Sequence, residues 1–149
     1  PMIHNTINQF LQSTDWGELD YLIVDLPPGT SDAPLTVMQA LQMDGFVVVT
    51  TPQSLAVLDA KRSINMVRKM NVNILGVVEN FSGDVFGRGP GESLAKEMEI
   101  PFLGHLELRA DYRQVDRPTV LASQVVSEEY AQIVANVQRE LEAVPNPAS

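Results

Sequence analysis

Short apolar runs without intervening polar residues constrain the fold of this chain more than any other feature. They lie at Tyr21–Val24, Phe46–Thr50 and Ile74–Val78, and a weaker run follows at Phe102–Leu103. A strand with one face in water alternates apolar and polar side chains, whereas a strand buried on both faces is apolar throughout. The runs therefore predict strands of a parallel sheet that is covered by helices.

Stretches with helical spacing of apolar residues separate these runs. Apolar residues recur every three or four positions from Val57 to Met70, which predicts a helix with one apolar stripe. Similar helices are predicted at residues 3–11, 92–98 and 130–141. Ser127, which is followed by two glutamates, is predicted to cap the last of them.

Alternating helices and strands predict an α/β domain with right-handed crossovers. A chain of 149 residues has room for one such domain with a proper core. We expect residues 1–143 to belong to a single domain. Residues 144–149, which include two prolines, are expected to form a disordered tail.

Charge and cysteine content argue against several functions. The chain has 19 acidic and 10 basic residues, a net charge of −9, which disfavours nucleic acid or an anionic membrane as a partner. It has no cysteine, and its two histidines, His4 and His105, lie far apart in sequence, so a thiolate or zinc site is not expected. No apolar run reaches the ~18–20 residues that span a bilayer, and no signal-peptide pattern is present. The expected location is the cytoplasm.

The loop after the first apolar run is a candidate ligand site, because ligands of parallel sheets bind beyond the carboxyl ends of the strands. Asp25 directly follows the run, and Leu26-Pro27-Pro28-Gly29-Thr30 comes next. A carboxylate there can hold Mg²⁺ through water ligands, and a glycine lets the backbone approach a phosphate closely. The alternative is that Asp25 only solvates a strand end and that Pro-Pro-Gly is an ordinary turn.

The string from Tyr21 to Asp32 resembles the Walker B and switch II region of Mrp/ApbC-type ATPases, which belong to the MinD/ParA superfamily of P-loop proteins. Further matching blocks follow the same order along the chain: Asp15–Asp20, Thr50–Gln53, Leu58–Lys61, Gly76–Asn80, Phe86–Gly89 and Ile100–Gly104. The resemblance implies a Rossmann-like P-loop NTPase fold, a three-layer α/β domain with a mostly parallel sheet, whose N-terminal strands are absent here.

Proteins of this family bind and slowly hydrolyse ATP as homodimers, and they are implicated in iron–sulfur cluster assembly or transfer. The resemblance implies that Asp25 is the catalytic carboxylate that organises Mg²⁺ and that Gly29 lies near the γ-phosphate. It also implies that Asn80 recognises the adenine edge, a task that suits a side chain able to donate and accept hydrogen bonds. The alternative for Asn80 is a turn former. ATP and Mg²⁺ are the implied cofactors; a homodimer or higher homo-oligomer and iron–sulfur client proteins are the implied partners.

Other matching positions leave two interpretations open. Thr50, Thr51 and Gln53 lie where the family's dimer faces and nucleotide come close, or they cap the following helix. Asp59 and Lys61 match the family, but a solvated helix face would carry the same residues. In the segment Gly104–Leu108, where the family closes over the base, no individual contact is assigned.

The chain departs from the family in two ways. No Gly-x-x-x-x-Gly-Lys-Ser/Thr pattern occurs, so we interpret the chain as a fragment that by itself binds ATP weakly or not at all. The stretch Gly87–Gly91 lacks the lysine and is interpreted as a flexible lead into a helix. The Cys-x-x-Cys that many relatives carry between Asn80 and Phe86 is also absent, so this chain is not expected to ligate an iron–sulfur cluster.

Three functions follow as hypotheses. The leading one is an incomplete ATPase module linked to iron–sulfur cluster assembly. The first alternative is a partitioning or positioning ATPase of the ParA/MinD kind; against it, the last helix is acidic, whereas membrane-targeting helices are basic. The second alternative is an inactive domain that only dimerises.

Overall fold

The computed structural model describes residues 2–26, 32–113 and 116–144. The chain divides into two compact units, Pro1–Met43 and Asp44–Ser149. The predicted tail lies outside the described residues apart from Val144.

The first unit contains two helices that pack against each other, α1 (Met2–Ser13) and α2 (Asp32–Ala40). The helix predicted at residues 3–11 is therefore confirmed. Helix α2 buries Thr36, Val37 and Met38. Residues 14–26, which follow α1, form neither helix nor strand.

The strand predicted at Tyr21–Val24 is wrong. All four side chains are exposed, and Ile23 retains 89% of its accessible surface. A strand exists only through hydrogen bonds to a neighbouring strand, and all strand pairing among the described residues lies in the second unit. The apolar composition indicated a segment suited to burial, but it carried no information on whether a partner strand would lie beside it.

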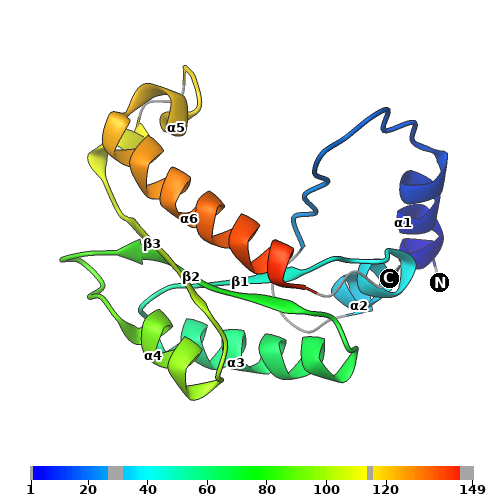
Figure 1. The fold of residues 1–149 in the computed structure, drawn as a ribbon, viewed down its shortest axis with the longest axis horizontal. Helices are drawn as coiled ribbons and strands as arrows, with labels where there is room; N and C mark the ends of the chain where they lie inside the picture. Colours follow the sequence, from blue (N-terminus) through cyan, green and yellow to red (C-terminus); the bar gives the residue numbers. More distant parts are fainter. Residues whose placement is uncertain (1, 27–31, 114–115, 145–149) are drawn as a thin grey trace. The chain divides into compact units, whose positions relative to one another are not determined.

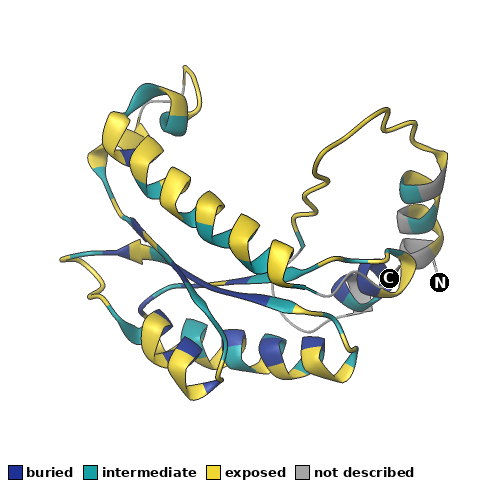
Figure 2. Cartoon of the chain, viewed as in Figure 1, coloured by how far each residue is buried: buried dark blue, intermediate teal, exposed yellow. Residues whose placement is uncertain are grey.

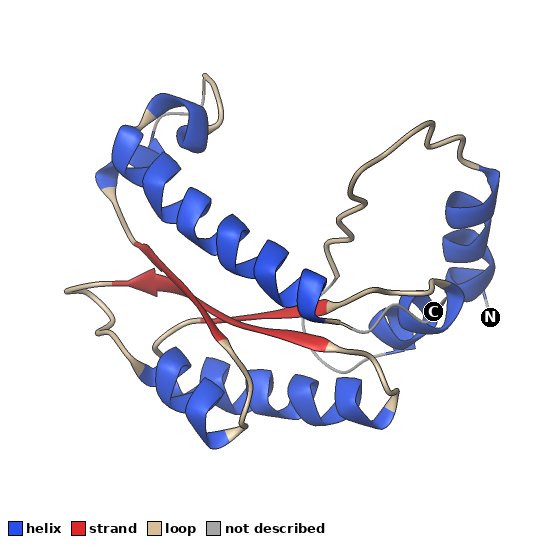
Figure 3. Ribbon diagram, viewed as in Figure 1, coloured by secondary structure: helices blue, strands red, loops and turns tan. Residues whose placement is uncertain are grey.

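The second unit contains a parallel sheet in the order β1-β2-β3. Its strands are β1 (Phe46–Thr50), β2 (Ile74–Ser82) and β3 (Phe102–Glu107), drawn as red arrows in Figure 3. They confirm three of the predicted apolar strands. Both β2 and β3 run further towards their carboxyl ends than the apolar runs do, so their last residues are polar.

Helices cover both faces of this sheet, as Figure 1 shows. Helices α3 (Ser54–Lys69) and α4 (Pro90–Glu97) lie on one face, and α6 (Gln124–Ala143) lies on the other. The 3₁₀ turn η1 (Ala110–Arg113) and the short helix α5 (Thr119–Ala122) come between β3 and α6. The predicted three-layer α/β architecture with a parallel sheet is confirmed.

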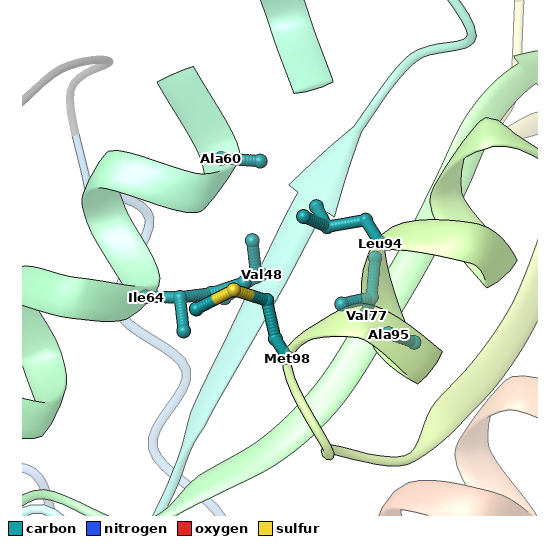
Figure 4. Close-up of a cluster of buried hydrophobic side chains, with 7 residues drawn as sticks. All are labelled: Val48, Ala60, Ile64, Val77, Leu94, Ala95 and Met98. Carbon is teal, nitrogen blue, oxygen red and sulfur yellow. The ribbon is translucent and has the colours of Figure 1, made fainter. Parts of the chain in front are cut away.

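The core of the second unit lies between the sheet and the pair α3 and α4. Figure 4 shows its cluster of buried side chains: Val48, Ala60, Ile64, Val77, Leu94, Ala95 and Met98. Burial of a Val, Leu, Ile or Met side chain contributes roughly 1.5–3 kcal/mol, so this cluster is a main source of the unit's stability. Figure 2, coloured by burial, shows both buried and exposed residues along these helices, whose outward sides are exposed.

Helix α6 approaches β3 closely because the strand has a glycine at the crossing point. A Cβ atom on Gly104 would lie 2.9 Å from Cγ1 of Ile133. The side-chain amide of Asn136 also donates a hydrogen bond to the carbonyl of Leu103 at 2.8 Å. Both contacts hold the helix against the strand.

The start of α6 differs from the prediction. Ser123, not Ser127, caps the helix, and its hydroxyl oxygen accepts a hydrogen bond from the Val126 N–H at 3.5 Å. Val126 is fully buried, so the first turn already packs against the rest of the unit and begins before the glutamate pair. Along the described helices, no stretch combines the length and the apolar character needed to cross a membrane.

Candidate functional site

The predicted site residues fall in different parts of the chain. Asp25 is exposed and lies in the irregular segment of the first unit, whereas Asn80 lies near the end of β2 in the second unit and is half-buried. Gly29 lies outside the described residues. A common site of the three residues stays a prediction, and the structure details the surroundings of Asn80 within the second unit.

Asn80 and Phe81 form a bulge in β2. They lie between the paired positions Glu79 and Ser82, where β3 has a single residue. Phe81 has a φ of 57°, a left-handed conformation that bulky residues rarely adopt. Its N–H donates to Oδ1 of Asn80 at 2.9 Å. Bulges redirect side chains and are frequent beside functional sites. The end of β2 therefore presents Asn80 in a defined orientation.

Glu79, just before the bulge, is a buried acid with a complete set of hydrogen bonds. The residue is 1% exposed. Its Oε1 accepts from the Ser82 hydroxyl at 2.8 Å and from the Gly89 N–H at 3.0 Å, and its Oε2 accepts from the Gly91 N–H at 2.6 Å. Burying a carboxylate is unfavourable unless it is hydrogen-bonded, and these donors satisfy it. The carboxylate thereby joins the end of β2 to the start of α4.

The glycine-rich stretch Gly87–Gly91 leads into α4, as predicted, and its backbone is hydrogen-bonded. Gly83 and Gly87 exchange backbone hydrogen bonds at 2.9 and 2.7 Å, which closes a tight hairpin. The N–H groups of Gly89 and Gly91 are both directed at Glu79. A carboxylate of the same chain thus uses the helix amides that a phosphate would need.

Thr50, the last residue of β1, and Thr51, which follows it, do not cap α3. Gln53 occupies the N-cap position and makes no side-chain capping hydrogen bond. The Thr50 hydroxyl donates instead to the carbonyl of Thr51 at 3.3 Å. The capping interpretation is therefore wrong, and a role of these residues near a nucleotide or a partner subunit stays a prediction.

Asp59 and Lys61 lie on the exposed side of α3. Asp59 accepts from Arg62 at 2.9 Å, and Lys61 forms an ion pair with Glu97 of α4. Both contacts are surface ion pairs, which contribute little stability. The arrangement agrees with a solvated helix face.

An ion-pair network lies beyond the end of β3. Arg109 binds Oε2 of Glu107 at 2.8 Å and Oε1 of Glu129 at 2.5 Å, and Glu107 also pairs with Arg88. The hydrogen bond that Arg109 donates to Glu129, opposed by burial, raises the pKa of the Arg109 guanidinium. The network connects the end of β3 to α6, because Glu129 belongs to that helix.

Tyr112 lies next to this network, in η1. Burial raises the pKa of its hydroxyl to about 12, and the neighbouring Tyr130 and Glu129 add to the effect. The tyrosine is therefore protonated at neutral pH and in mild alkali.

Sequence reasoning missed the structural roles of Glu79 and Arg109. The signal for Glu79 was present, since a charged residue directly after a buried apolar run must be paired if the strand continues. Arg109 carried no such signal, because its partner Glu129 lies in a different element. Across the described parts of both units, no group of three or more His, Cys, Asp or Glu side chains is arranged to hold a metal ion.

Solved structures similar to this one include nucleotide-binding proteins. A nucleotide-binding protein from Archaeoglobus fulgidus in complex with ADP is 31% identical with a TM-score of 0.67, over 97% of this chain and 59% of that chain. The cell division ATPase MinD from Pyrococcus furiosus has a TM-score of 0.73 at 19% identity, over 91% of this chain and 58% of its own, which shows the fold alone. The fold is that of a Rossmann-like P-loop NTPase.

The model of the ParA family described as NUBPL iron-transfer P-loop NTPase matches residues 1–142. The chain belongs to this family, which confirms the resemblance seen in the sequence. An iron-sulfur cluster carrier protein of Methanocaldococcus jannaschii is 42% identical over 95% of this chain and 54% of its own length. The Synechocystis protein of that name is 47% identical, over 76% and 35%. The cytosolic Fe-S cluster assembly factor CFD1 of Candida glabrata is 45% identical, over 72% and 42%. The chain spans about a third to a half of these relatives.

Proposed function

We propose that this chain belongs to a protein that binds and hydrolyses ATP and acts in iron–sulfur cluster assembly or transfer. The observation that carries the proposal is its 42% identity, over 95% of its length, to a relative named as an iron-sulfur cluster carrier. Membership of a family of iron-transfer P-loop NTPases supports the same function. We further propose that residues 1–143 belong to one domain and that the protein works in the cytoplasm.

Two parts of the ATP site are assigned to this chain. Asp25 holds Mg²⁺ through water ligands, and Gly29 provides a backbone amide near the γ-phosphate. Asn80 contacts the adenine edge: its Oδ1 keeps a second lone pair beside the Phe81 hydrogen bond, and its amide group donates. The exposed carboxylate and the half-buried amide fit the metal and base ends of Mg-ATP. When bound, Mg²⁺ neutralises charge on the phosphates.

The iron–sulfur cluster is cargo in this proposal, not a group held by this chain alone. The chain has no cysteine, so thiolate ligands have to come from a client protein or another segment. We propose a homodimer as the working assembly, since the implied nucleotide site lies near the dimer face in this family. Iron–sulfur proteins that receive the cluster are the proposed clients.

The test is a chimera that joins the amino-terminal part of the Methanocaldococcus relative to Pro1 of this chain. We expect Mg²⁺-dependent ATP hydrolysis, which Asp25→Ala reduces by about two orders of magnitude, a typical loss for a group that organises charge in the transition state. The exposed substitution Asp59→Ala is the control and is expected to retain activity. A folded chimera that neither binds nor hydrolyses Mg-ATP would refute the proposed ATPase function.

A second measurement addresses the iron–sulfur role. The chimera is reconstituted with iron and sulfide and mixed with an apo-ferredoxin, and cluster transfer is followed by visible absorption. Transfer that depends on the chimera supports the proposal. ATP hydrolysis without cluster transfer, combined with nucleotide-dependent binding to a scaffold or membrane, would favour the partitioning alternative.

A further inference from the structure

Glu79 is a buried acid that has no part in the proposed chemistry, yet it adjoins the residue assigned to the base. The carboxylate of Glu79 is directed at the start of α4, and Asn80 follows it as the first residue of the bulge. We propose that Glu79 is a positioning residue, whose carboxylate holds the bulge in the shape that orients Asn80. The functional consequence rests on the proposed role of Asn80 in base recognition.

The two oxygens of the carboxylate act on different segments. Oε1 accepts from Ser82 at 2.8 Å and so closes the bulge from one end to the other. It also accepts from the Gly89 N–H at 3.0 Å, while Oε2 accepts from the Gly91 N–H at 2.6 Å. One buried side chain therefore fixes the bulge against the helix that follows it.

The bulge depends on such a restraint because its own conformation is unfavourable. Phe81 has a φ of 57°, and a bulky residue stays in this region only where its surroundings hold it there. The N–H of Phe81 makes the hydrogen bond that orients Asn80, at 2.9 Å. If the backbone of Phe81 relaxes, this donor turns away and the Asn80 amide loses its orientation.

No conservative replacement reproduces this set of acceptors. Glutamine has one oxygen and one NH₂ group, so it would direct a donor at the Ser82–Gly89 pair or at the Gly91 N–H. Aspartate is shorter by one methylene and cannot reach α4 and span the bulge at once. The inference thus predicts that Glu79→Gln and Glu79→Asp both disturb Asn80, although one keeps the size and the other keeps the charge.

The first experiment uses the full 149-residue chain labelled with ¹⁵N, without nucleotide. In Glu79→Gln we expect the amide protons of Gly89 and Gly91 to move upfield and the side-chain amide signals of Asn80 to shift. We also expect exchange at Gly89 and Gly91 to accelerate at least about tenfold, as for a locally opened segment. Unchanged Asn80 signals, even with altered glycine signals, would overturn the proposal. If this variant does not fold, Ser82→Ala is measured in its place with the same expectations for Asn80.

The control separates positioning from general loss of stability. Ile64→Val removes one methyl group from the core, at a fully buried site on α3. It is expected to lower stability while leaving the Asn80 and Gly91 signals in place. If the control shifts the Asn80 signals as much as Glu79→Gln does, Asn80 responds to stability in general and the proposal is wrong.

The second experiment measures binding of Mg-ATP and Mg-GTP to the chimera described above. A positioning role predicts that Glu79→Gln reduces the preference for ATP over GTP about tenfold, whereas a purely structural defect weakens both nucleotides alike. Asn80→Ala shows whether Asn80 reads the base at all. If Asn80→Ala leaves the preference intact, the proposed base contact fails, and the magnetic resonance experiment still decides the role of Glu79.

Discussion

The N–H of Gly91 lies 2.6 Å from Oε2 of Glu79, and a methyl group at Gly91 would lie 2.9 Å from Cβ of Glu79. Glycine to alanine in a helix usually stabilises by up to about 1 kcal/mol. At Gly91 we expect alanine to lower stability instead, because the added methyl group displaces a buried carboxylate from its hydrogen-bond donors.

We therefore expect Gly91→Ala to lower the free energy of unfolding by about 1–3 kcal/mol, the range for overpacking and for disturbed buried hydrogen bonds. Urea unfolding followed by circular dichroism measures the change. Ser93→Ala, on the exposed side of α4, is the matched control and is expected to stay within about 0.5 kcal/mol of the parent. A Gly91→Ala variant as stable as the parent would contradict the close contact.

Gly104→Ala tests the crossing of α6 over β3. Gly104 has a φ of 138°, and an added Cβ would lie 2.9 Å from Cγ1 of Ile133. Both backbone strain and the contact oppose alanine, so we expect a loss of about 2–4 kcal/mol. In the background of Ile133→Ala, Gly104→Ala should cost less stability, because the contact is gone. The part of the loss that comes from the backbone strain at Gly104 should remain. Additive effects in this double-mutant cycle would show that the two residues do not touch.

Arg109→Met tests the network beyond β3. The substitution leaves Glu107 and Glu129 without their shared partner, and we expect a loss of about 1–2 kcal/mol, less than for fully buried pairs because the side chains are part-exposed. The stability of the parent should fall more with added salt than that of the variant. Arg62→Met, which removes only an exposed pair with Asp59, is the control. Equal stability of Arg109→Met and the control would argue against a structural role of the network.

Tyr112 should make stability depend on pH in the alkaline range. Its pKa is raised from 10.0 to about 12 in the folded protein, so folding favours the protonated hydroxyl. The stabilisation that this pKa difference contributes is fully present below about pH 10, and it is lost as the pH rises towards about 12. Because the residue is 37% exposed, the effect is reduced by solvent screening.

Melting temperatures across this range measure the effect in the parent and in Tyr112→Phe. We expect the substitution to flatten the alkaline decline. If Tyr112→Phe and the parent lose stability in parallel, the raised pKa does not contribute.

The outer edge of β1 predicts self-association of the chain. Strand β1 pairs with β2, and no other strand among residues 2–26, 32–113 and 116–144 pairs with it. Val49 in this strand is 59% exposed. Unpaired apolar edges template pairing with other chains, and a lysine there opposes it. We expect light scattering to show mass increasing with concentration, and Val49→Lys to reduce the increase. A monomer at all concentrations would refute this prediction.

The sequence by itself determined the layered architecture of the second unit. The runs at Phe46–Thr50 and Ile74–Val78 are apolar throughout, and the helix between them has one apolar stripe, so only a parallel sheet covered by helices could bury both. The order of the matching blocks also identified the family correctly. These properties depend on local composition and spacing, which are visible along the chain.

Tertiary structure decided what depends on residues far apart in sequence. Whether the run at Tyr21–Val24 becomes a strand depends on a neighbouring strand, and the strand pairing among the described residues does not include this run. The bulge that orients Asn80 depends on register with β3, and the role of Glu79 depends on amides of Gly89 and Gly91 that only the fold brings to it. Strand pairing and hydrogen bonding of buried charges are non-local, and a pattern read along one segment does not contain the partner.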